Sequence, residues 1–414
     1  MILVRNLLQQ LNGNKLLFFS LTLSLFVSCA SIFVNTNNNT KHEETTNDFE
    51  VNSKKQEAQE PILFLDKVIH APVQRDEKIK VAILLPFNIG KSAAYSSIRE
   101  TVLEYYEGFE LALEELSKEG SEIEVEVFDT KSDSSEVAFI LTKPFLKNCN
   151  IIVGPIFDHE ISQVENFCSV YNIQYVNPLR NYIKKTRTSI PVFNPIAADS
   201  NKHYFAALKL IELYPKHQFI LVNDNTTQGF AARKGYQKAF SDANISLKYM
   251  SPDELKTSLI SNVETTVIAP VTSELNVRKV LNAGAGKKET QILGLEEWFD
   301  FPIIPFDLWN KNNLLFFNNY QLETENPEKI QFEQNYHNKY NTNAGKYAYI
   351  GYDQARFFIG ALCTFGLESY SYIQNKNFPM IHNNFNFKNM GNNVFENSSV
   401  NLLKLVDFEL VKIK

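Results

Sequence analysis

The chain has 414 residues and carries 47 acidic against 41 basic side chains, which gives a formal net charge of −6 at pH 7. This slightly acidic balance and the lack of a basic cluster argue against nucleic acid as a partner. Roughly 340 residues remain once the N-terminal segments described next are set aside, which is more than one hydrophobic core usually holds, so two lobes are expected.

The first 28 residues have the pattern of a secretory signal. An apolar stretch from Leu16 to Val27 follows Arg5 and Lys15, and it is too short for a comfortable membrane span. The residues up to Cys29 resemble the bacterial lipobox, in which the cysteine thiol receives a diacylglyceryl group. We therefore expect a signal peptide followed by lipidation of Cys29, and two or three acyl chains give stable anchoring. The alternative is a plain cleaved signal with an incidental cysteine.

Two further segments precede the folded part. Residues 29–60 are polar and rich in Asn, Thr, Glu and Lys, so they cannot bury a core. We interpret them as a lipid-anchored flexible tether. Residues 61–77 contain several apolar side chains and predict an arm that packs on the folded domain.

From Val81 to Pro155 the pattern alternates between strands and helices. Continuous apolar runs indicate strands buried on both faces, spacings of three or four indicate amphipathic helices, and alternation with glutamates indicates a sheet edge. The predicted elements are a buried strand at 81–85, a helix at 102–116 that ends near Gly120, an edge strand at 123–127, a helix at 137–146 and a buried strand at 151–153. Parallel strands joined by helices bind ligands at their carboxyl ends. Residues 86–88, 129–130 and 154–157 should therefore share one rim.

The same theme continues to the C-terminus. Asn194-Pro195 punctuates the chain, and a second α/β lobe is expected from about residue 197 to about residue 320. The predicted elements are a helix at 161–171, a strand at 173–176, a helix at 204–211, a strand at 219–222, a helix at 230–240, segments at 246–250 and 255–263, a strand at 267–269, a helix at 277–283, and strands at 291–293 and 314–317. Helices at 329–340 and 348–367 should return to the first lobe. Strand-like segments at 385–387 and 402–413 flank an Asn-rich stretch that looks like a turn.

Five motifs together resemble the type I periplasmic binding proteins, which include the branched-chain amino acid binding proteins of ABC importers. The motifs are Lys80–Pro86, Tyr106–Phe109, Phe128–Thr130, Ile152–Pro155 and Tyr349–Asp353. Their order and spacing extend the resemblance from about Lys78 to the C-terminus. The chain also looks similar to lipoproteins of the Bacteroidota that carry this fold, some of which have a LysM module that is not found here.

The resemblance implies two doubly wound parallel-sheet lobes joined by a hinge, with three crossings between them. They would fall near Asn194-Pro195, near Leu322-Glu323 and near residue 370. The first lobe would then hold residues 78–195 and 323–370, and the second would hold 196–322 and 371–414, including a C-terminal hairpin. In this family the lobes close on a ligand in the cleft.

Carried over onto this chain, the resemblance implies a ligand site at the strand ends of both lobes. The implied residues are Asn88, Tyr95, Asp129, Ile156, Phe157 and Asn177 from the first lobe, Asn223, Asp224, Pro270, Glu296 and Trp298 from the second, and Tyr352 from the helical return. Family members that bind an amino acid grip its carboxylate with hydroxyl residues after the third strand. Residues 154–160 here offer no hydroxyl and carry negative charge, so an amino-acid carboxylate would be poorly served.

Several residues keep two interpretations open. Asp129 could contact a ligand, or it could cap a helix or brace a loop. Trp298 could stack on a sugar or an aromatic ligand, although core packing is the favoured interpretation. A tyrosine cluster could form a partner surface or helix core: Tyr336, Tyr340, Tyr347, Tyr349 and Tyr352.

Nothing in the sequence indicates an enzyme. It contains no Gly-x-Ser-x-Gly elbow, no His-Glu-x-x-His and no Cys-x-x-Cys. We expect no catalytic residue, no metal and no cofactor. Cys149 and Cys168 could form a disulfide, but buried thiols are favoured for them and for Cys363.

We expect an envelope protein that is held by its lipid anchor at the periplasmic side of the outer membrane, and two functions follow for it. The first is a solute-binding lipoprotein that captures a small molecule or a peptidoglycan-related ligand between its lobes and hands it to a transporter or sensor. The second is a non-catalytic scaffold that regulates a cell-wall synthase, similar to the penicillin-binding-protein activators, whose C-terminal domain has this fold.

Overall fold

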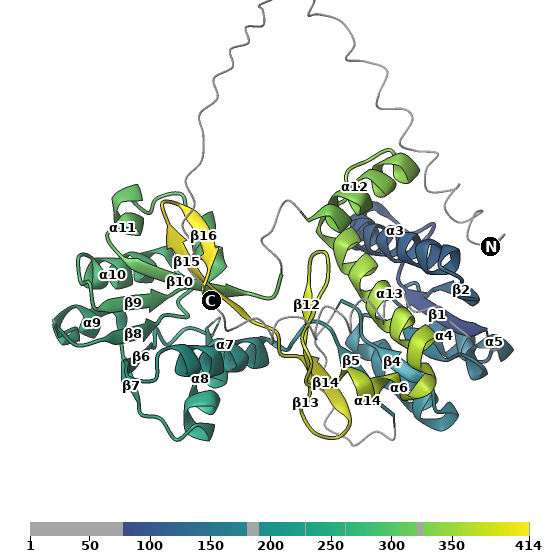
Figure 1. Ribbon diagram of the computed structural model, residues 1–414, viewed down its shortest axis with the longest axis horizontal. Helices are drawn as coiled ribbons and strands as arrows, with labels where there is room; N and C mark the ends of the chain where they lie inside the picture. The colour runs from purple at the N-terminus through teal and green to yellow at the C-terminus, as the bar shows by residue number, and fades with distance from the viewer. Residues whose placement is uncertain (1–77, 180–189, 228, 261, 321–325, 414) are drawn as a thin grey trace, which may run out of the picture. The chain divides into compact units, whose positions relative to one another are not determined.

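The computed structural model describes residues 78–413 except 180–189, 228, 261 and 321–325 (Figure 1). The predicted signal peptide, the lipidation site at Cys29, the tether and the 61–77 arm lie outside the described residues. Each of the two lobes is built on a seven-stranded sheet.

The first sheet has the strand order β13-β14-β5-β4-β3-β1-β2. Its strands are β1 (Ile79–Leu85), β2 (Ile123–Asp129), β3 (Ile151–Val153), β4 (Gln174–Val176), β5 (Val192–Asn194), β13 (Phe387–Asn389) and β14 (Val394–Asn397). All neighbours pair in parallel except β13 and β14, which are antiparallel. The prediction that β2 forms a sheet edge is confirmed, because it is the last strand in the order.

The helices of the first lobe follow the predicted apolar stripes with one correction. They are η1 (Ala93–Tyr95), α3 (Ser96–Lys118), α4 (Ser134–Ile140), α5 (Pro144–Lys147), α6 (Asp158–Tyr171), α12 (Pro327–Tyr340), α13 (Lys346–Phe365), η3 (Gly366–Glu368) and α14 (Ser369–Ile373). The single helix predicted at 137–146 is wrong. Pro144 cannot continue a helix, because it lacks a backbone N–H, and it starts α5 instead.

The two helices after the second lobe return to the first, as predicted, and α13 packs on α3 at very short range (Figure 1). Two glycines allow this approach. A Cβ atom on Gly108 would lie 1.9 Å from the carbonyl oxygen of Ala348, and one on Gly351 would lie 1.9 Å from that of Tyr105. Inside the contact the Tyr105 hydroxyl donates a hydrogen bond to Gln354 Oε1 at 2.9 Å.

Tyrosines of α12 and α13 donate to carboxylates of α3. Tyr336 reaches Glu107 Oε2 at 2.6 Å, and Tyr352 reaches Glu115 Oε2 at 2.5 Å. Both rings are buried, and burial together with the neighbouring carboxylates raises the pKa of each phenol well above 10. For these two residues the tyrosine cluster is therefore helix packing.

The second sheet has the order β16-β15-β10-β9-β8-β6-β7. Its strands are β6 (Gln218–Val222), β7 (Leu247–Met250), β8 (Thr265–Ile268), β9 (Thr290–Leu293), β10 (Asn313–Asn318), β15 (Asn401–Val406) and β16 (Glu409–Lys412). Its helices are α7 (Asp199–Leu213), α8 (Phe230–Asp242), α9 (Pro252–Ser258), α10 (Glu274–Gly284), η2 (Glu296–Asp300) and α11 (Phe306–Asn310). The strands from β7 to β10 pair in parallel, whereas β10, β15 and β16 pair antiparallel, so the predicted C-terminal hairpin belongs to this sheet.

The third crossing between the sheets lies near Ser398, between β14 and β15, and not near residue 370. Of the segment 371–414 that was assigned to the second lobe, the part up to the end of β14 at Asn397 instead belongs to the first lobe, where β13 and β14 complete the first sheet. Its apolar side chains explain this: Phe395 stacks on Phe193 of β5 with ring centroids 5.3 Å apart, and Phe387 packs edge-on against the same ring at 5.4 Å. A short two-stranded sheet, β11 (Phe378–Pro379) with β12 (Asn384–Phe385), precedes these strands.

Three cysteines lie among the described residues, and all are buried. Cys149, Cys168 and Cys363 form no disulfide with one another. Burial raises the pKa of the Cys149 thiol to about 12, so it is protonated at neutral pH. Within the described ranges, no helix is both long enough and apolar enough to cross a bilayer, and no cluster of three or more His, Cys, Asp or Glu could hold a metal.

Candidate binding site

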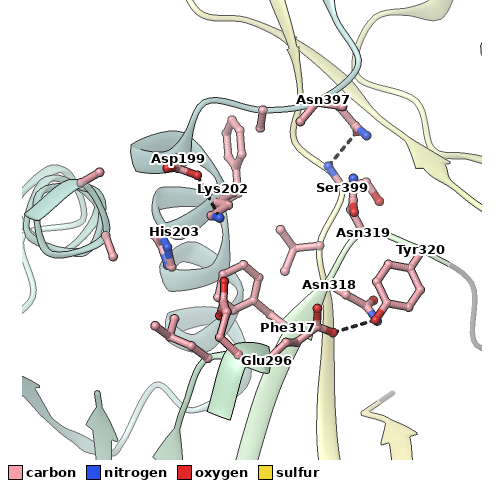
Figure 2. Close-up of a pocket in the computed structure, with 18 of the residues that line it drawn as sticks. Asp199, Lys202, His203, Glu296, Phe317, Asn318, Asn319, Tyr320, Asn397 and Ser399 are labelled. Atoms are coloured by element: carbon pink, nitrogen blue, oxygen red, sulfur yellow. Dashed lines mark hydrogen bonds and ion pairs between the residues drawn. The ribbon is translucent and has the colours of Figure 1, made fainter. Parts of the chain in front are cut away.

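A cavity of about 630 Å³ lies at the carboxyl ends of the strands of the second sheet. Segments that follow β8, β9 and β10 form one part of its wall, and the first turns of α7 and α8 form another. Residues of the first lobe and of the crossings complete it: Lys346, Ile350, His382, Asn383, Asn397 and Ser399. Figure 2 shows side chains from these segments turned toward one another around the cavity.

Glu296 is the central acidic group of the cavity wall. It is the first residue of η2, which starts shortly after the end of β9 at Leu293, and its Oε1 accepts a hydrogen bond from the Tyr320 hydroxyl at 2.8 Å (Figure 2). Burial raises the pKa of Glu296, and the bond from Tyr320 opposes that shift. Asn318 lies beside this pair, and its amide also lowers the pKa of Glu296. Its Oδ1 accepts a hydrogen bond from Asn401 Nδ2 at 3.3 Å, whereas its buried Nδ2 makes no hydrogen bond of good geometry among the described residues. A bound solute could accept a hydrogen bond from this amide while it donates one to Glu296.

The histidines beside the cavity are neutral at physiological pH. Burial lowers the pKa of His203 to about 3, and its Nδ1 lies 3.0 Å from the Tyr236 hydroxyl. Burial and the nearby Lys329 and Lys346 lower the pKa of His382 to about 4. Neutral imidazoles contribute a flat apolar surface and one donor or acceptor, not a charge.

One aromatic stack stands at the junction of the two lobes. The rings of Tyr320 and His382 lie 5.5 Å apart with an interplanar angle of 6°, and the ring of Tyr349 also packs on His382, with centroids 5.2 Å apart. Stacked rings expose a flat apolar face next to polar groups, which is the usual composition of a small-molecule site.

The cavity has more acidic than basic side chains. Its lining includes four carboxylates and two lysines: Asp199, Glu296, Glu297, Asp300, Lys202 and Lys346. Asp199 and Lys202 form an ion pair with each other at 2.9 Å, so carboxylates dominate the remaining charge of the lining. Such a wall disfavours a simple anion and favours a ligand that presents hydrogen-bond donors or a positive charge.

Among the residues expected from the sequence, Glu296 and Trp298 line this cavity. Trp298 is fully buried, its Nε1 donates to the Val271 carbonyl at 2.9 Å, and its ring packs on Gly294. The Trp298 ring therefore belongs to the core of the second lobe, and its contribution to the cavity is to hold η2 and the end of β8 together.

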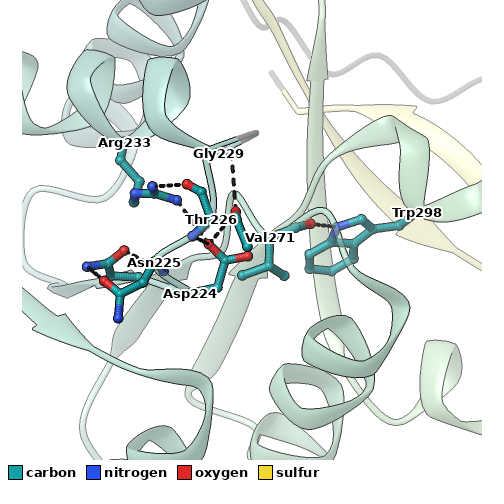
Figure 3. Close-up of polar contacts among 8 residues, drawn as sticks. Asp224, Asn225, Thr226, Gly229, Arg233, Val271 and Trp298 are labelled. Atoms are coloured by element: carbon teal, nitrogen blue, oxygen red, sulfur yellow. Dashed lines mark hydrogen bonds and ion pairs between the residues drawn. The ribbon is translucent and has the colours of Figure 1, made fainter.

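Asp224 and Asn223 close loops at the end of β6. Asp224 Oδ1 accepts hydrogen bonds from the Thr226 backbone N–H at 3.1 Å and from Arg233 Nη1 at 3.0 Å (Figure 3). Asn223 exchanges two bonds with Asn225. Neither residue is part of the cavity lining, and neither is Pro270.

In the first lobe, Asp129 braces the loop after β1. Its carboxylate accepts the backbone N–H groups of Asn88 and Ile89, each at 3.0 Å, and that of Lys131 at 2.9 Å. Asn88 is fully buried with a positive φ of 52°, and its Nδ2 donates to the Pro86 carbonyl. The loop-bracing interpretation of Asp129 therefore accounts for all three bonds.

The other residues expected from the first lobe lie apart from this cavity. Ile156 is buried, Phe157 stacks on His159, and Tyr95 lies under the Lys91 ammonium. The Tyr352 hydroxyl donates its hydrogen bond to Glu115 of α3, as described above. Asn177 is fully buried at the end of β4, and both polar atoms of its amide lack partners among the described residues. The structure thus does not bring these side chains to the cavity over the second lobe.

Sequence reasoning missed the residues at the lobe junction. Asn318 is the last residue of β10, and Asn319 and Tyr320 follow it directly, so the rule that sites form at strand ends could have found them. His382 and Asn383 lie in an Asn-rich stretch whose composition indicated only a turn.

Comparison with known proteins adds the fold family. No family model matches the chain, and no curated protein matches it. Solved structures do. A protein of Rhodospirillum rubrum that is assigned to a branched-chain amino acid ABC transporter matches with a TM-score of 0.58 at 11% identity, over 81% of this chain and all of that one.

LpoA of Haemophilus influenzae matches as well. Its C-domain, described as a regulator of PBP1A, has a TM-score of 0.55 at 13% identity over 81% of this chain and all of that one. The full-length protein has the same TM-score at 14% identity, over 82% of this chain and 60% of that one. At such identities the likeness shows the fold alone. The chain has the type I periplasmic binding fold, as the resemblance implied.

Proposed function

We propose that the chain is a non-catalytic binding protein that holds a small polar solute in the cavity around Glu296. The observation that carries this proposal is the convergence of a half-buried carboxylate, a buried amide nitrogen without a well-formed hydrogen bond and an aromatic stack on one cavity. A volume of about 630 Å³ lies within the range of ligand pockets.

The surplus of carboxylates defines the kind of solute. A ligand with amine or hydroxyl donors would complement Glu296, whereas an isolated carboxylate would meet like charge. A peptidoglycan-related fragment, which carries hydroxyl and amine groups, remains within this class. The R. rubrum neighbour and its link to an ABC transporter support transfer to a transporter as the purpose of binding.

We further infer an extracytoplasmic lipoprotein of the type found in Bacteroidota. Support comes from the signal-like pattern before Cys29 and from the fold, which its neighbours use in the envelope. The Cys29→Ser variant should lose palmitate labelling and leave the membrane fraction. If it stayed with the membrane, the lipid anchor, and with it a place at the periplasmic side of the outer membrane, would be refuted.

Thermal shift of the full chain against a metabolite library tests solute binding. A solute at one hundred times its Kd should add about 2.7 kcal/mol to the free energy of unfolding. The same solute should stabilise Glu296→Gln less, and Glu274→Gln, which changes an acidic residue at the start of α10, should respond like the parent protein. Failure of every solute to shift the parent protein would contradict the proposal.

A second function, regulation of an envelope partner such as a cell-wall synthase, is favoured by one surface. Ile303 and Phe306 are 65% and 70% exposed, and Phe306 stacks on Phe408 of the β15–β16 turn at 4.1 Å. Exposed apolar surface of this kind often marks a protein contact. The likeness to the LpoA C-domain agrees with this alternative. Capture of a synthase by the parent protein, lost in Phe306→Asp, would support it.

A further inference from the structure

One part of the cavity wall that comes from the first lobe is a four-residue turn between β11 and β12. Phe378 pairs with Phe385 and Pro379 with Asn384, and the Met380 N–H donates to the Asn383 carbonyl at 2.8 Å. We call residues 380–383 the latch turn. His382 and Asn383, at its tip, both line the cavity.

A single buried carboxylate holds the latch turn in place. Asp353 lies inside α13 with no exposed surface. Its Oδ1 accepts the Ile381 N–H at 3.2 Å, and its Oδ2 accepts the N–H of His382 at 3.2 Å and that of Asn383 at 2.6 Å. The Asn383 side-chain Nδ2 adds a fourth bond at 2.9 Å. Four donors from one turn therefore converge on one side chain of the neighbouring helix.

The latch turn in turn contacts the segment that leaves the second sheet. Tyr320 forms an antiparallel bridge with Asn383, and the Asn384 N–H donates to the Asn319 carbonyl at 3.0 Å. Through the stack of His382 on Tyr320, and the bond of Tyr320 to Glu296, contacts run without a gap from α13 to the central acidic group of the cavity.

We propose that Asp353 is the positioning residue of this binding site: it fixes the latch turn, and through His382 and Tyr320 it sets the orientation of Glu296. Asp353 itself does not line the cavity. A buried carboxyl group that accepts four hydrogen bonds is a specific support, because an amide, which has one acceptor oxygen, or a shorter side chain leaves N–H groups without an acceptor. An effect of Asp353 on solute affinity rests on the proposed solute-binding function, whereas its role in holding the latch turn does not.

The ring of His382 provides a direct readout in the protein without any solute. While the latch turn is in place, burial keeps the pKa of His382 at about 4. Release of the turn would expose the ring and return its pKa toward the ordinary value near 6.5. His203, whose pKa burial lowers to about 3 in the second lobe, serves as an internal reference.

The experiment follows both histidines by NMR in the full chain labelled at histidine, with the His382 signal assigned from His382→Gln. In Asp353→Asn we expect the pKa of His382 to rise toward 6.5 while that of His203 stays. Amide protection of residues 381–383 should fall by about 100-fold while that of residues 151–153 is kept, because local opening is independent of the sheet core. Val280→Ala, a core change in α10, is the control for general destabilisation. It should change neither the pKa of His382 nor the amide protection of residues 381–383.

Asn383→Ala changes the same contact, between Asp353 and the latch turn, on the side of the turn, and it leaves α13 intact. The positioning role of Asp353 can therefore be tested even if the Asp353 variant does not fold. An unchanged pKa of His382 in a folded variant, or loss of protection throughout the first lobe, would overturn the positioning role. Either result would leave the solute-binding function to be tested separately by thermal shift. Conversely, a failed solute screen would not affect the role of Asp353 in holding the latch turn, which the pKa of His382 and the amide protection decide.

Discussion

The two lobes use the carboxyl ends of their parallel strands differently. In the first lobe, Asp129 is the last residue of β2, and its carboxylate accepts hydrogen bonds from three backbone N–H groups of neighbouring loops. In the second lobe, Glu296 follows β9 and accepts one hydrogen bond from Tyr320, which leaves acceptor capacity for a solute. Position at a strand end is therefore not sufficient for a binding role. The neighbouring loop must leave the side chain unsatisfied.

Arg233 should show the largest effect, on stability. The Asp224 carboxylate is entirely buried and the Arg233 guanidinium pairs with it at 3.0 Å (Figure 3). Arg233→Ala leaves a buried charge without its partner, so we expect a loss of about 3–5 kcal/mol in the free energy of unfolding. Urea denaturation measures it, with Arg233→Lys as the milder control. A loss below 1 kcal/mol would show that this strand end is not structural, and it would weaken the contrast drawn above.

Asp129→Ala should cost less, and it should act on stability alone. Three backbone N–H groups lose their acceptor, and the Asn88 side chain beside them is fully buried, so we expect a loss of about 2–3 kcal/mol. Denaturation of this variant is compared with Asp133→Ala, which removes an exposed helix cap and should cost less. A large change in solute affinity without loss of stability would assign Asp129 to binding after all.

His382 should give a smaller, pH-dependent effect. Its pKa is about 4 in the folded protein and near 6.5 in the unfolded chain. The unfolded chain therefore binds the extra proton first, and the stability that the neutral ring contributes is lost as the pH falls from 6.5 toward 4. Between pH 6.5 and 5.5 this amounts to roughly 1 kcal/mol. His382→Asn should flatten that part of the pH profile, as measured by Tm at each pH, and an unchanged profile would contradict the buried position of the ring.

Glu296→Gln should have the smallest effect on stability and a clear effect on binding. Burial disfavours the ionised carboxylate, so the neutral amide should change the free energy of unfolding by less than about 0.5 kcal/mol. Loss of the charge should weaken the binding of a donor-rich solute by about tenfold or more, and a tenfold change in Kd corresponds to about 1.4 kcal/mol. Calorimetric titration with the solute found by thermal shift separates the two quantities. A destabilised variant with unchanged affinity would place Glu296 in the same structural class as Asp129.

The sequence was informative where apolar periodicity is long and uninterrupted. The buried run of β1, the stripe of α3 and the glutamate alternation of β2 each have one physical interpretation, and the structure confirms them. Short elements were not predictable in this way. β5 has three residues, and the pattern of β14 is hidden among asparagines that indicate a turn, so the third crossing was placed too early.

The cavity was predictable only in part for a related reason. Glu296 follows a recognisable strand and was expected from the resemblance, whereas His382 and Asn383 reach the site through a turn held by Asp353. That support joins residues about 30 positions apart and has no local signal in the sequence. Similarly, the hydrogen bonds that engage Asp129 depend on loop conformation, which side-chain type and spacing alone do not specify.

Thermal unfolding of the parent protein, Asp129→Asn and Glu296→Gln with the same solute tests the central contrast most directly. The account predicts that a solute raises the Tm of the parent and of Asp129→Asn by similar amounts and raises that of Glu296→Gln by clearly less. Equal stabilisation of Glu296→Gln and the parent, with a diminished shift in Asp129→Asn, would contradict it and would move the binding site to the first lobe.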